Sequence, residues 1–282
     1  MQQNGSEVDR FRSIMIGERK SPYTVKEYTF LATIFIDFIG KNLSQCTAVD
    51  VENFKNYLAT SKKYSKSSQY LAIKAIKHFF KVMDVPQPRN LTSPKRSKKV
   101  PNYLTEREMG LMLNDENQEL KTRLIVSILA NTGIRVGELC HLNTEDVDLE
   151  EGILHVKSGK GDRDRIVLLP DTTVSLIREY LKSRNILDVD TPSLLVSRRG
   201  NRFDTSTIER IIRNAARGAG IQKKVTPHVL RHTFATAILR NGGDIRFIQQ
   251  LLGHASLNTT EIYTHIDESA LKEMYEKHRP RY

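Results

Sequence analysis

Residues 132–139 read Thr132-Gly133-Ile134-Arg135-Val136-Gly137-Glu138-Leu139, a stretch in which a loop enters a helix. Arg135 follows the loop, so its side chain can point into a cleft. Glu138 lies three residues farther along and faces the same side of the helix, where it can orient Arg135 or a histidine. An arginine near a helix start is usually an ordinary surface residue, so its meaning depends on what the rest of the chain supplies.

A short hairpin follows this stretch, and helices surround both. Residues 153–156 and 165–169 are apolar runs typical of strands, and the turn-rich residues 158–162 join them. Lys160 is therefore expected at the tip of the hairpin. Apolar residues in most other segments recur at a helical period, so we expect a fold that is mainly α with a small β-sheet. The expected helices cover 22–39, 50–58, 65–83, 121–130, 244–252 and 267–277, with others beginning at 105, 172 and 227.

A proline-rich, basic stretch divides the chain. Pro86, Pro88 and Pro94 interrupt regular structure, and no acidic residue lies between Arg89 and Lys99. This composition is typical of a solvated linker, and a basic linker can also cross a DNA groove. The expected parts are a helical unit at 1–88, a basic linker at 89–101 and a second unit at 102–282.

The charge of the chain favours a polyanionic partner. Its 282 residues carry a net charge of +11, although a merely soluble basic surface would have the same sign. Phosphates bind well at helix starts, but serines at such positions also cap helices for structural reasons. The candidate DNA-binding side chains are Lys66 and Ser67 at a helix start, and Arg89, Lys95, Arg96, Lys98 and Lys99 in the linker.

Metal sites, disulfides and membrane segments are not expected. Cys46 and Cys140 lie far apart without a CxxC pattern, which argues against a disulfide framework or structural zinc. His228 and His232 have the spacing of a zinc pair, but Val229 stands where a zinc protease motif has glutamate. No signal peptide opens the chain and its apolar runs are too short to span a bilayer, so we expect a cytoplasmic protein without cofactors.

Six dispersed side chains supply the chemistry of phosphoryl transfer. Attack on a phosphodiester adds negative charge to the nonbridging oxygens, and the arginine fork matches two of these oxygens at once. A tyrosine hydroxyl can attack if it loses its proton, and the departing alkoxide needs a proton in return. Lys160 is the expected general acid, with Lys157, Arg163 and Arg165 as open alternatives. The candidate catalytic set is Arg135, Lys160, His228, Arg231, His254 and Tyr263, with Glu138 beside Arg135.

Taken together, these motifs resemble the tyrosine recombinases, also called the phage integrase family, and within it the Xer type most closely. The resemblance covers about residues 102–270 and keeps the family's order and spacing. The matching motifs are Thr-Gly-Ile-Arg-x-Gly-Glu-Leu at 132–139, Gly-Lys-Gly at 159–161, His-x-Leu-Arg-His-Thr-Phe-Ala-Thr at 228–236, Leu-Leu-Gly-His-x-Ser at 251–256 and Thr-Thr-x-x-Tyr-Thr-His at 259–265.

The resemblance implies a role for each residue. Tyr263 would form a 3′-phosphotyrosyl link to DNA, Lys160 would protonate the 5′-hydroxyl leaving group, and the arginines and histidines would bind the scissile phosphate. It also implies a helical, SAM-like core-binding domain ahead of the catalytic domain. The C-terminal helix would dock into a neighbouring protomer, which gives a tetramer on two DNA duplexes.

The implied function is site-specific recombination of double-stranded DNA through a Holliday junction. The expected role is resolution of chromosome dimers at a short near-palindromic site, because no additional arm-binding domain precedes the helical unit. The alternatives are an integrase of a mobile element, a type IB-like topoisomerase, or a DNA-binding accessory protein whose catalytic residues are dormant.

Overall fold

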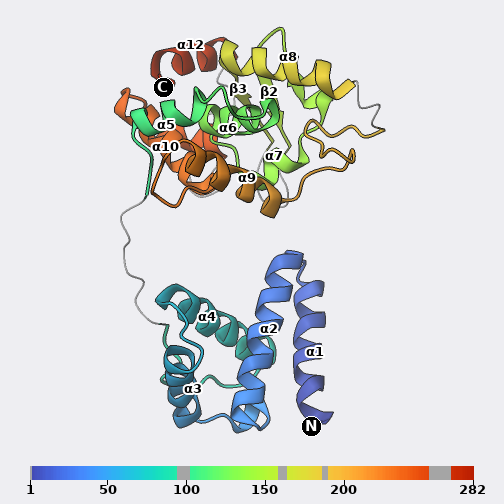
Figure 1. Ribbon diagram of the computed structural model, residues 1–282. Coiled ribbons are helices and arrows are strands. Elements are labelled where there is room, and N and C mark those ends of the chain that lie inside the picture. The colour runs from blue at the N-terminus through green and yellow to red at the C-terminus, as the bar shows by residue number, and fades with distance from the viewer. Residues whose placement is uncertain (1, 94–101, 158–163, 186–189, 254–267) are drawn as a thin grey trace. The chain divides into compact units, whose positions relative to one another are not determined.

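The chain forms two compact units, residues 1–100 and 101–282 (Figure 1). The computed structural model describes residues 2–93, 102–157, 164–185, 190–253 and 268–282, with the backbone alone for 2–5 and 268–270. Each unit has a hydrophobic core of its own. None of the described helices is both long enough and apolar enough to cross a bilayer.

The first unit is a set of helices around an aromatic core. Ser21, Thr47 and Ser65 cap three of the helices, since each side chain accepts the backbone N–H of the residue three positions on. Phe35 is fully buried, and its ring centroid lies 5.0 Å from that of Phe54 and 6.2 Å from that of Phe80. The elements are α1 (Gln2–Gly17), α2 (Pro22–Ile39), the short 3₁₀ helix η1 (Leu43–Gln45), α3 (Ala48–Thr60) and α4 (Lys66–Val82).

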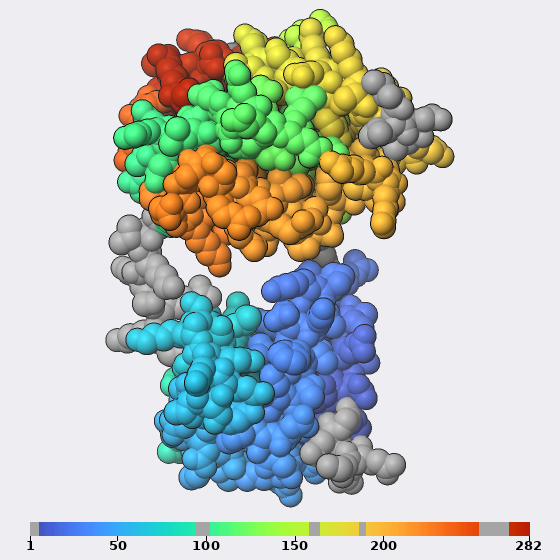
Figure 2. Space-filling view, viewed as in Figure 1, coloured from blue at the N-terminus to red at the C-terminus, as the bar shows by residue number. Residues whose placement is uncertain are grey.

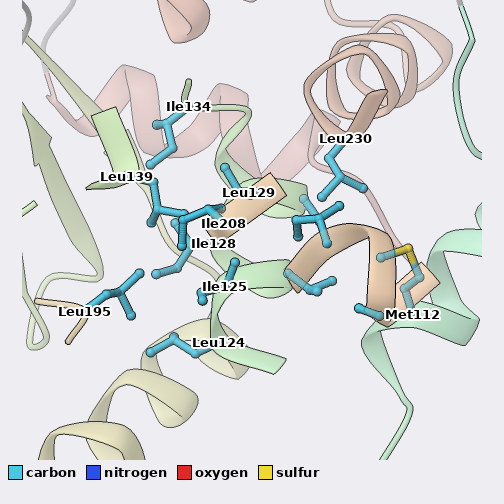
Figure 3. Packing of buried hydrophobic residues seen from close by; sticks show 14 of the residues in the cluster. Met112, Leu124, Ile125, Ile128, Leu129, Ile134, Leu139, Leu195, Ile208 and Leu230 are labelled. Atoms are coloured by element: carbon cyan, nitrogen blue, oxygen red, sulfur yellow. The ribbon is translucent and has the colours of Figure 1, made fainter. Parts of the chain in front are cut away.

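The second unit packs its helices around a buried one, α6 (Leu120–Thr132). The other elements are α5 (Glu106–Leu113), α7 (Val136–His141), the 3₁₀ helix η2 (Thr144–Asp146), β1 (Val147–Asp148), β2 (Ile153–Val156), β3 (Arg165–Leu168), α8 (Asp171–Asn185), α9 (Thr205–Gly218), α10 (Pro227–Arg240), α11 (Ile245–Leu252) and α12 (Glu268–His278). Residues 124–132 of α6 are all buried, and the helix packs against α8, α9 and α10. Figure 3 shows Ile125, Ile128 and Leu129 of α6 within this core, with Leu230 of α10 nearby.

The three strands form an antiparallel sheet in the order β1-β2-β3. In the hairpin Leu154 pairs with Val167, and Val156 pairs with Arg165 at the end where the connecting residues leave the sheet. Leu154 and Val167 belong to the large core around α6, whereas Ile153 and Leu168 belong to a smaller core with α10 and α11. Both faces of the hairpin are therefore packed against a core. This packing fixes the position of Arg165, the first residue of β3.

The last helix, α12, packs on its own unit in this chain. Leu271 and Tyr275 are buried in the smaller core together with Phe234. The Tyr275 hydroxyl donates a 2.9 Å hydrogen bond to the carbonyl of Asn131, near the end of α6. Burial raises the pKa of Tyr275 well above its usual range, so the hydroxyl stays protonated and keeps its donor role.

The fold class predicted from the sequence is confirmed. The helices that begin at Pro22 and Pro227 and the two hairpin strands are present as predicted. The helix expected from residue 50 begins two residues earlier, because Thr47 caps it. The separate helix α1 and the two-residue strand β1 were not predicted. The hairpin tip, where Lys160 was expected, lies outside the described residues.

Gly133→Ala should destabilise the second unit more than the matched change Gly220→Ala. Both glycines have a positive φ, +62° and +75°, so alanine costs about 1 kcal/mol of backbone strain at either position. A Cβ at Gly133 would lie 2.5 Å from Cδ1 of the buried Phe234, whereas one at Gly220 would meet no heavy atom within 4 Å. Overpacking should add about 1–3 kcal/mol at Gly133 alone. Urea unfolding measures both losses, and equal losses would contradict the close packing.

Candidate active site

The C-terminal end of α11 gathers three arginines that are far apart in the sequence. Carbonyl groups at the end of a helix have no intrahelical partner and carry partial negative charge. Here three successive carbonyls each accept a hydrogen bond from a different arginine. The bonds run from Arg165 Nε to Leu251 O at 2.9 Å, from Arg231 Nη2 to Leu252 O at 2.8 Å, and from Arg135 Nη2 to Gly253 O at 3.5 Å.

Glu138 joins two of these arginines. Arg135 is the N-cap residue of α7, and its backbone N–H donates to Glu138 Oε2 at 2.7 Å while its Nη1 donates to Oε1 at 2.9 Å. Arg165 binds the same carboxylate through Nη1 and Nη2, at 2.9 and 2.8 Å. The predicted contact between Glu138 and Arg135 is therefore present, and it is shared with a second arginine.

The ion pairs keep the Glu138 carboxylate charged. Burial raises its pKa, but the hydrogen bonds from Arg165 and from the Arg135 backbone act in the opposite direction and outweigh burial. The pKa of Glu138 thus lies below its usual range, and the group is an anion at neutral pH.

Helix α10 contributes the other arginine and a histidine. Thr226 caps the helix and Pro227 occupies its first turn, as the sequence predicts. Arg231 is 8% exposed, and its Nη1 donates to Gly133 O, so its guanidinium joins the end of α6 to the end of α11. His228, three residues earlier, is exposed on the first turn of the helix. Within the described ranges no group of three or more histidine, cysteine, aspartate or glutamate side chains could hold a metal ion.

The described part of the site has excess positive charge. Arg135 and Arg165 share the one carboxylate of Glu138, and Arg231 donates to backbone carbonyls, so the cluster attracts an anion. Arg135 has a side chain that is 33% exposed, whereas the Arg165 side chain is 8% exposed. Arg135 is thus the arginine of this pair that can meet a phosphate arriving from solvent.

Two of the open alternatives for the general acid have other partners. The Nζ of Lys157 lies 2.6 Å from the buried Asp146 and 3.2 Å from Glu145. Hydrogen bonds to these two carboxylates raise the pKa of Lys157, which makes it a weaker acid. Arg165 is committed to Glu138, and Arg163 lies outside the described residues.

Several predicted residues lie outside the described part of the chain. They are Lys160, His254 and Tyr263 of the catalytic set and Lys95, Arg96, Lys98 and Lys99 of the linker. The described residues bring together Arg135, Glu138 and Arg231, and they add Arg165, whose link to Glu138 is not apparent from the sequence.

Basic side chains also lie on two exposed helix surfaces. Lys66 and Ser67 are exposed in the first turn of α4, and Arg89 is exposed beyond that helix. On α9 the exposed face carries three arginines, and the opposite face is buried; Figure 2 shows residues of α9 and α10, in orange, along one side of the second unit. Their spacing of three and four residues places them on one helix face and is visible in the sequence. These arginines are Arg210, Arg213 and Arg217.

Both units match sequence profiles of the same protein family. The sequence profile of the phage integrase family matches residues 102–270, and that of the phage integrase N-terminal SAM-like domain matches residues 8–85. Tyrosine recombinase XerA of Pyrococcus furiosus is 40% identical over 277 residues, which cover 96% of this chain and 93% of the relative.

Solved structures give the same result. A crystal structure of XerA recombinase is 56% identical, with a TM-score of 0.55 over 99% of this chain and 100% of that chain. A structure of the XerH site-specific recombinase bound to its difH substrate, in a pre-cleavage complex, is 27% identical. Its TM-score is 0.70 over 88% of this chain and 78% of that chain.

Glu138→Gln should cost the most stability near neutral pH and the least in acid. The depressed pKa means that the ionised carboxylate stabilises the fold fully above the pKa of an unfolded glutamate, about 4.3. This contribution is lost as the pH falls through the lower pKa of the folded state. Urea unfolding of wild type and variant from about pH 7 down to about pH 3 measures the difference.

Glu209→Gln, on the exposed side of α9, controls for the loss of one negative charge. The stability difference between wild type and Glu138→Gln should narrow in acid. A difference that stays constant or widens there would show that the arginines do not hold the carboxylate in its charged form.

Proposed function

The chain belongs to the phage integrase family, as a tyrosine recombinase of the Xer type, and we propose that it resolves chromosome dimers at a short, near-palindromic DNA site. It cuts and rejoins DNA by site-specific recombination through a Holliday junction. The relatives that it matches over nearly their whole length support the dimer-resolving role, as does the XerH structure with its difH substrate. The cytoplasm is the proposed location, since the substrate is the chromosome.

The arginine cluster at the end of α11 is the observation that carries the proposal. Arg135 and Arg231 hold their guanidinium groups through contacts to carbonyl and carboxylate groups of the protein itself. Such preorganised donors need little reorganisation when negative charge develops on a phosphate. Together with His228 and His254 they bind the scissile phosphate.

Strand transfer then needs a nucleophile and an acid. The Tyr263 hydroxyl oxygen attacks phosphorus and forms a phosphotyrosyl bond at the 3′ end, while the bond from phosphorus to O5′ breaks. A histidine of the site accepts the phenol proton, and Lys160 gives a proton to O5′, which leaves as a free hydroxyl. Rejoining reverses the step with the 5′-hydroxyl of the other duplex. The phosphotyrosine conserves the bond energy, so no nucleotide is consumed.

Both units bind the DNA backbone. The exposed Lys66 and Ser67 at the start of α4 and the three arginines of α9 are suited to phosphate contacts. The linker residues Lys95, Arg96, Lys98 and Lys99 add to this charge. Phosphate contacts of this kind position the protein on DNA, and each weakens as salt rises.

The active assembly is a tetramer on two duplexes. Helix α12 covers the smaller core with Leu271 and Tyr275. The same side chains can fill the same core of a neighbouring protomer, because exchange of an identical element replaces each contact with an equivalent one. Exchange of α12 around a ring of four protomers would link the subunits.

The wild-type protein should form a covalent adduct with a nicked duplex carrying its site, in the presence of EDTA. Tyr263→Phe should form none, because phenylalanine has no hydroxyl to attack phosphorus. Tyr263→Phe protein can first be used to recover the bound site from fragments of the host genome. A denaturing gel then separates the adduct from free protein.

Each other outcome identifies a different function. An adduct with Tyr263→Phe would mean that another residue is the nucleophile. Relaxation of any supercoiled plasmid, without site preference, would indicate a topoisomerase. Tight binding with no adduct would indicate an accessory protein, and recovery of the ends of a mobile element would indicate an integrase.

Lys160→Ala should lose cleavage of an ordinary nicked site and regain it on a 5′-phosphorothiolate, since a departing sulfur needs no proton. Lys157→Ala is the matched control and should resemble wild type on both substrates, because Asp146 and Glu145 hold the Lys157 side chain. Single-turnover adduct formation measures both variants. If instead Lys157→Ala lost cleavage of the ordinary site and regained it on the phosphorothiolate, while Lys160→Ala cleaved both substrates normally, the general acid would be Lys157.

A further inference from the structure

The sequence offers Arg165 only as an alternative general acid, yet this arginine lies at the centre of the site. Its Nε donates to Leu251 O, and its Nη1 and Nη2 donate to the two oxygens of Glu138. Its side chain is 8% exposed. Each of the three nitrogens thus donates to the protein, and because the side chain is nearly buried, the effect of Arg165 on DNA is expected through the residues that it holds.

The Glu138 carboxylate connects Arg165 to Arg135. Oε1 accepts from Arg135 Nη1 and from Arg165 Nη1, both at 2.9 Å. Oε2 accepts from the backbone N–H of Arg135 at 2.7 Å and from Arg165 Nη2 at 2.8 Å. The fork of Arg165 binds both oxygens and so fixes the plane of the carboxylate. That plane sets where the Arg135 guanidinium lies.

Gly253 shows how closely Arg165 is packed. This residue ends α11 with a φ of +64°. A Cβ there would lie 2.9 Å from Arg165 Nη1 and 3.1 Å from its Cδ, so the guanidinium occupies the space that any other side chain would need. The start of β3 is thereby fixed against the end of α11, independently of the contact with Glu138.

We propose that Arg165 is a positioning residue for DNA cleavage: through Glu138 it aims the Arg135 guanidinium at the scissile phosphate, and through Leu251 it holds the end of α11 at the same point. The inference rests on the proposed function, because it takes Arg135 to be a phosphate ligand. Lysine cannot replace Arg165 in this role, since a single ammonium group does not reach two carboxylate oxygens and a carbonyl in fixed directions.

The test uses the full chain and the nicked duplex that carries the recovered genomic site. Arg165→Ala should slow single-turnover adduct formation about 100-fold, the cost expected when a reacting group is misplaced by an ångström. The affinity for the intact site should change by no more than about twofold, because the Arg165 side chain is nearly buried and donates to groups of the protein. Arg165→Lys should recover only part of the rate.

A matched arginine separates positioning from general stability. Arg184 is a buried arginine, 8% exposed as a whole residue, and it donates to the carbonyls of Ser193 and Thr191. Arg184→Ala should lower the melting temperature as Arg165→Ala does, but it should leave the cleavage rate within about twofold of wild type.

A neutral substrate gives a readout that instability does not affect. In a methylphosphonate, a methyl group replaces one nonbridging oxygen, so less negative charge develops in the transition state and fewer guanidinium contacts are needed. The rate deficits of Arg135→Ala and Arg165→Ala should both shrink on this substrate. Adding Arg165→Ala to Glu138→Ala should cost no more than about a further twofold, because the two side chains act as one unit.

The results of these experiments test the positioning role of Arg165 separately from the proposed recombinase function. If wild type forms an adduct but Arg165→Ala cleaves at the wild-type rate, the positioning role is overturned and the recombinase function stands. Equal deficits on the phosphate and the methylphosphonate would also overturn it, since they indicate only a loss of folded protein. If wild type forms no adduct on the recovered site, both the function and the inference fall.

Discussion

The carbonyls that have no helical partner at the end of α11 are the constraint on which the site depends. A helix must end with carbonyl groups that its own backbone cannot satisfy, and here three of them are bound by arginines from α7, β3 and α10. These arginines approach one another closely although like charges repel. The partial negative charge of the helix end and the carboxylate of Glu138 offset that repulsion.

The surrounding hydrophobic core holds the arginines and the carbonyls of α11 in their relative positions. Helix α6 is buried along most of its length and ends at Gly133, whose carbonyl accepts from Arg231. Phe234, one turn after Arg231 on α10, packs against Gly133 and belongs to the same core as α11 and α12. Packing and polar contacts therefore act on the same residues, so a change in core volume at Gly133 reaches the guanidinium of Arg231 directly.

Many of the helix ends around the site could be predicted, because the residues that mark them are local in the sequence. Thr226 with Pro227, and Gly253 after an apolar run, mark helix ends by their own backbone preferences. Helix α1 escaped prediction because its first turn carries no acidic residue, and β1 has only two residues. The contacts of Arg165 could not be read from spacing at all, since its partners lie 27 and 86 residues away along the chain and depend on the packing of both hairpin faces.

Because the Arg165 and Glu138 pair is buried, ionic strength should affect it less than it affects the exposed basic side chains of α4 and α9. Mobile ions screen exposed charges over about 10 Å at ordinary salt concentrations, but they act weakly on a pair whose side chains are 8% and 9% exposed. The basic side chains of α4 and α9 lie on the surface, where added salt would compete with the phosphate contacts proposed for them. Under the proposed function, salt would govern whether the protein holds DNA, while the geometry of the Arg165 and Glu138 pair would persist at salt concentrations that release the DNA.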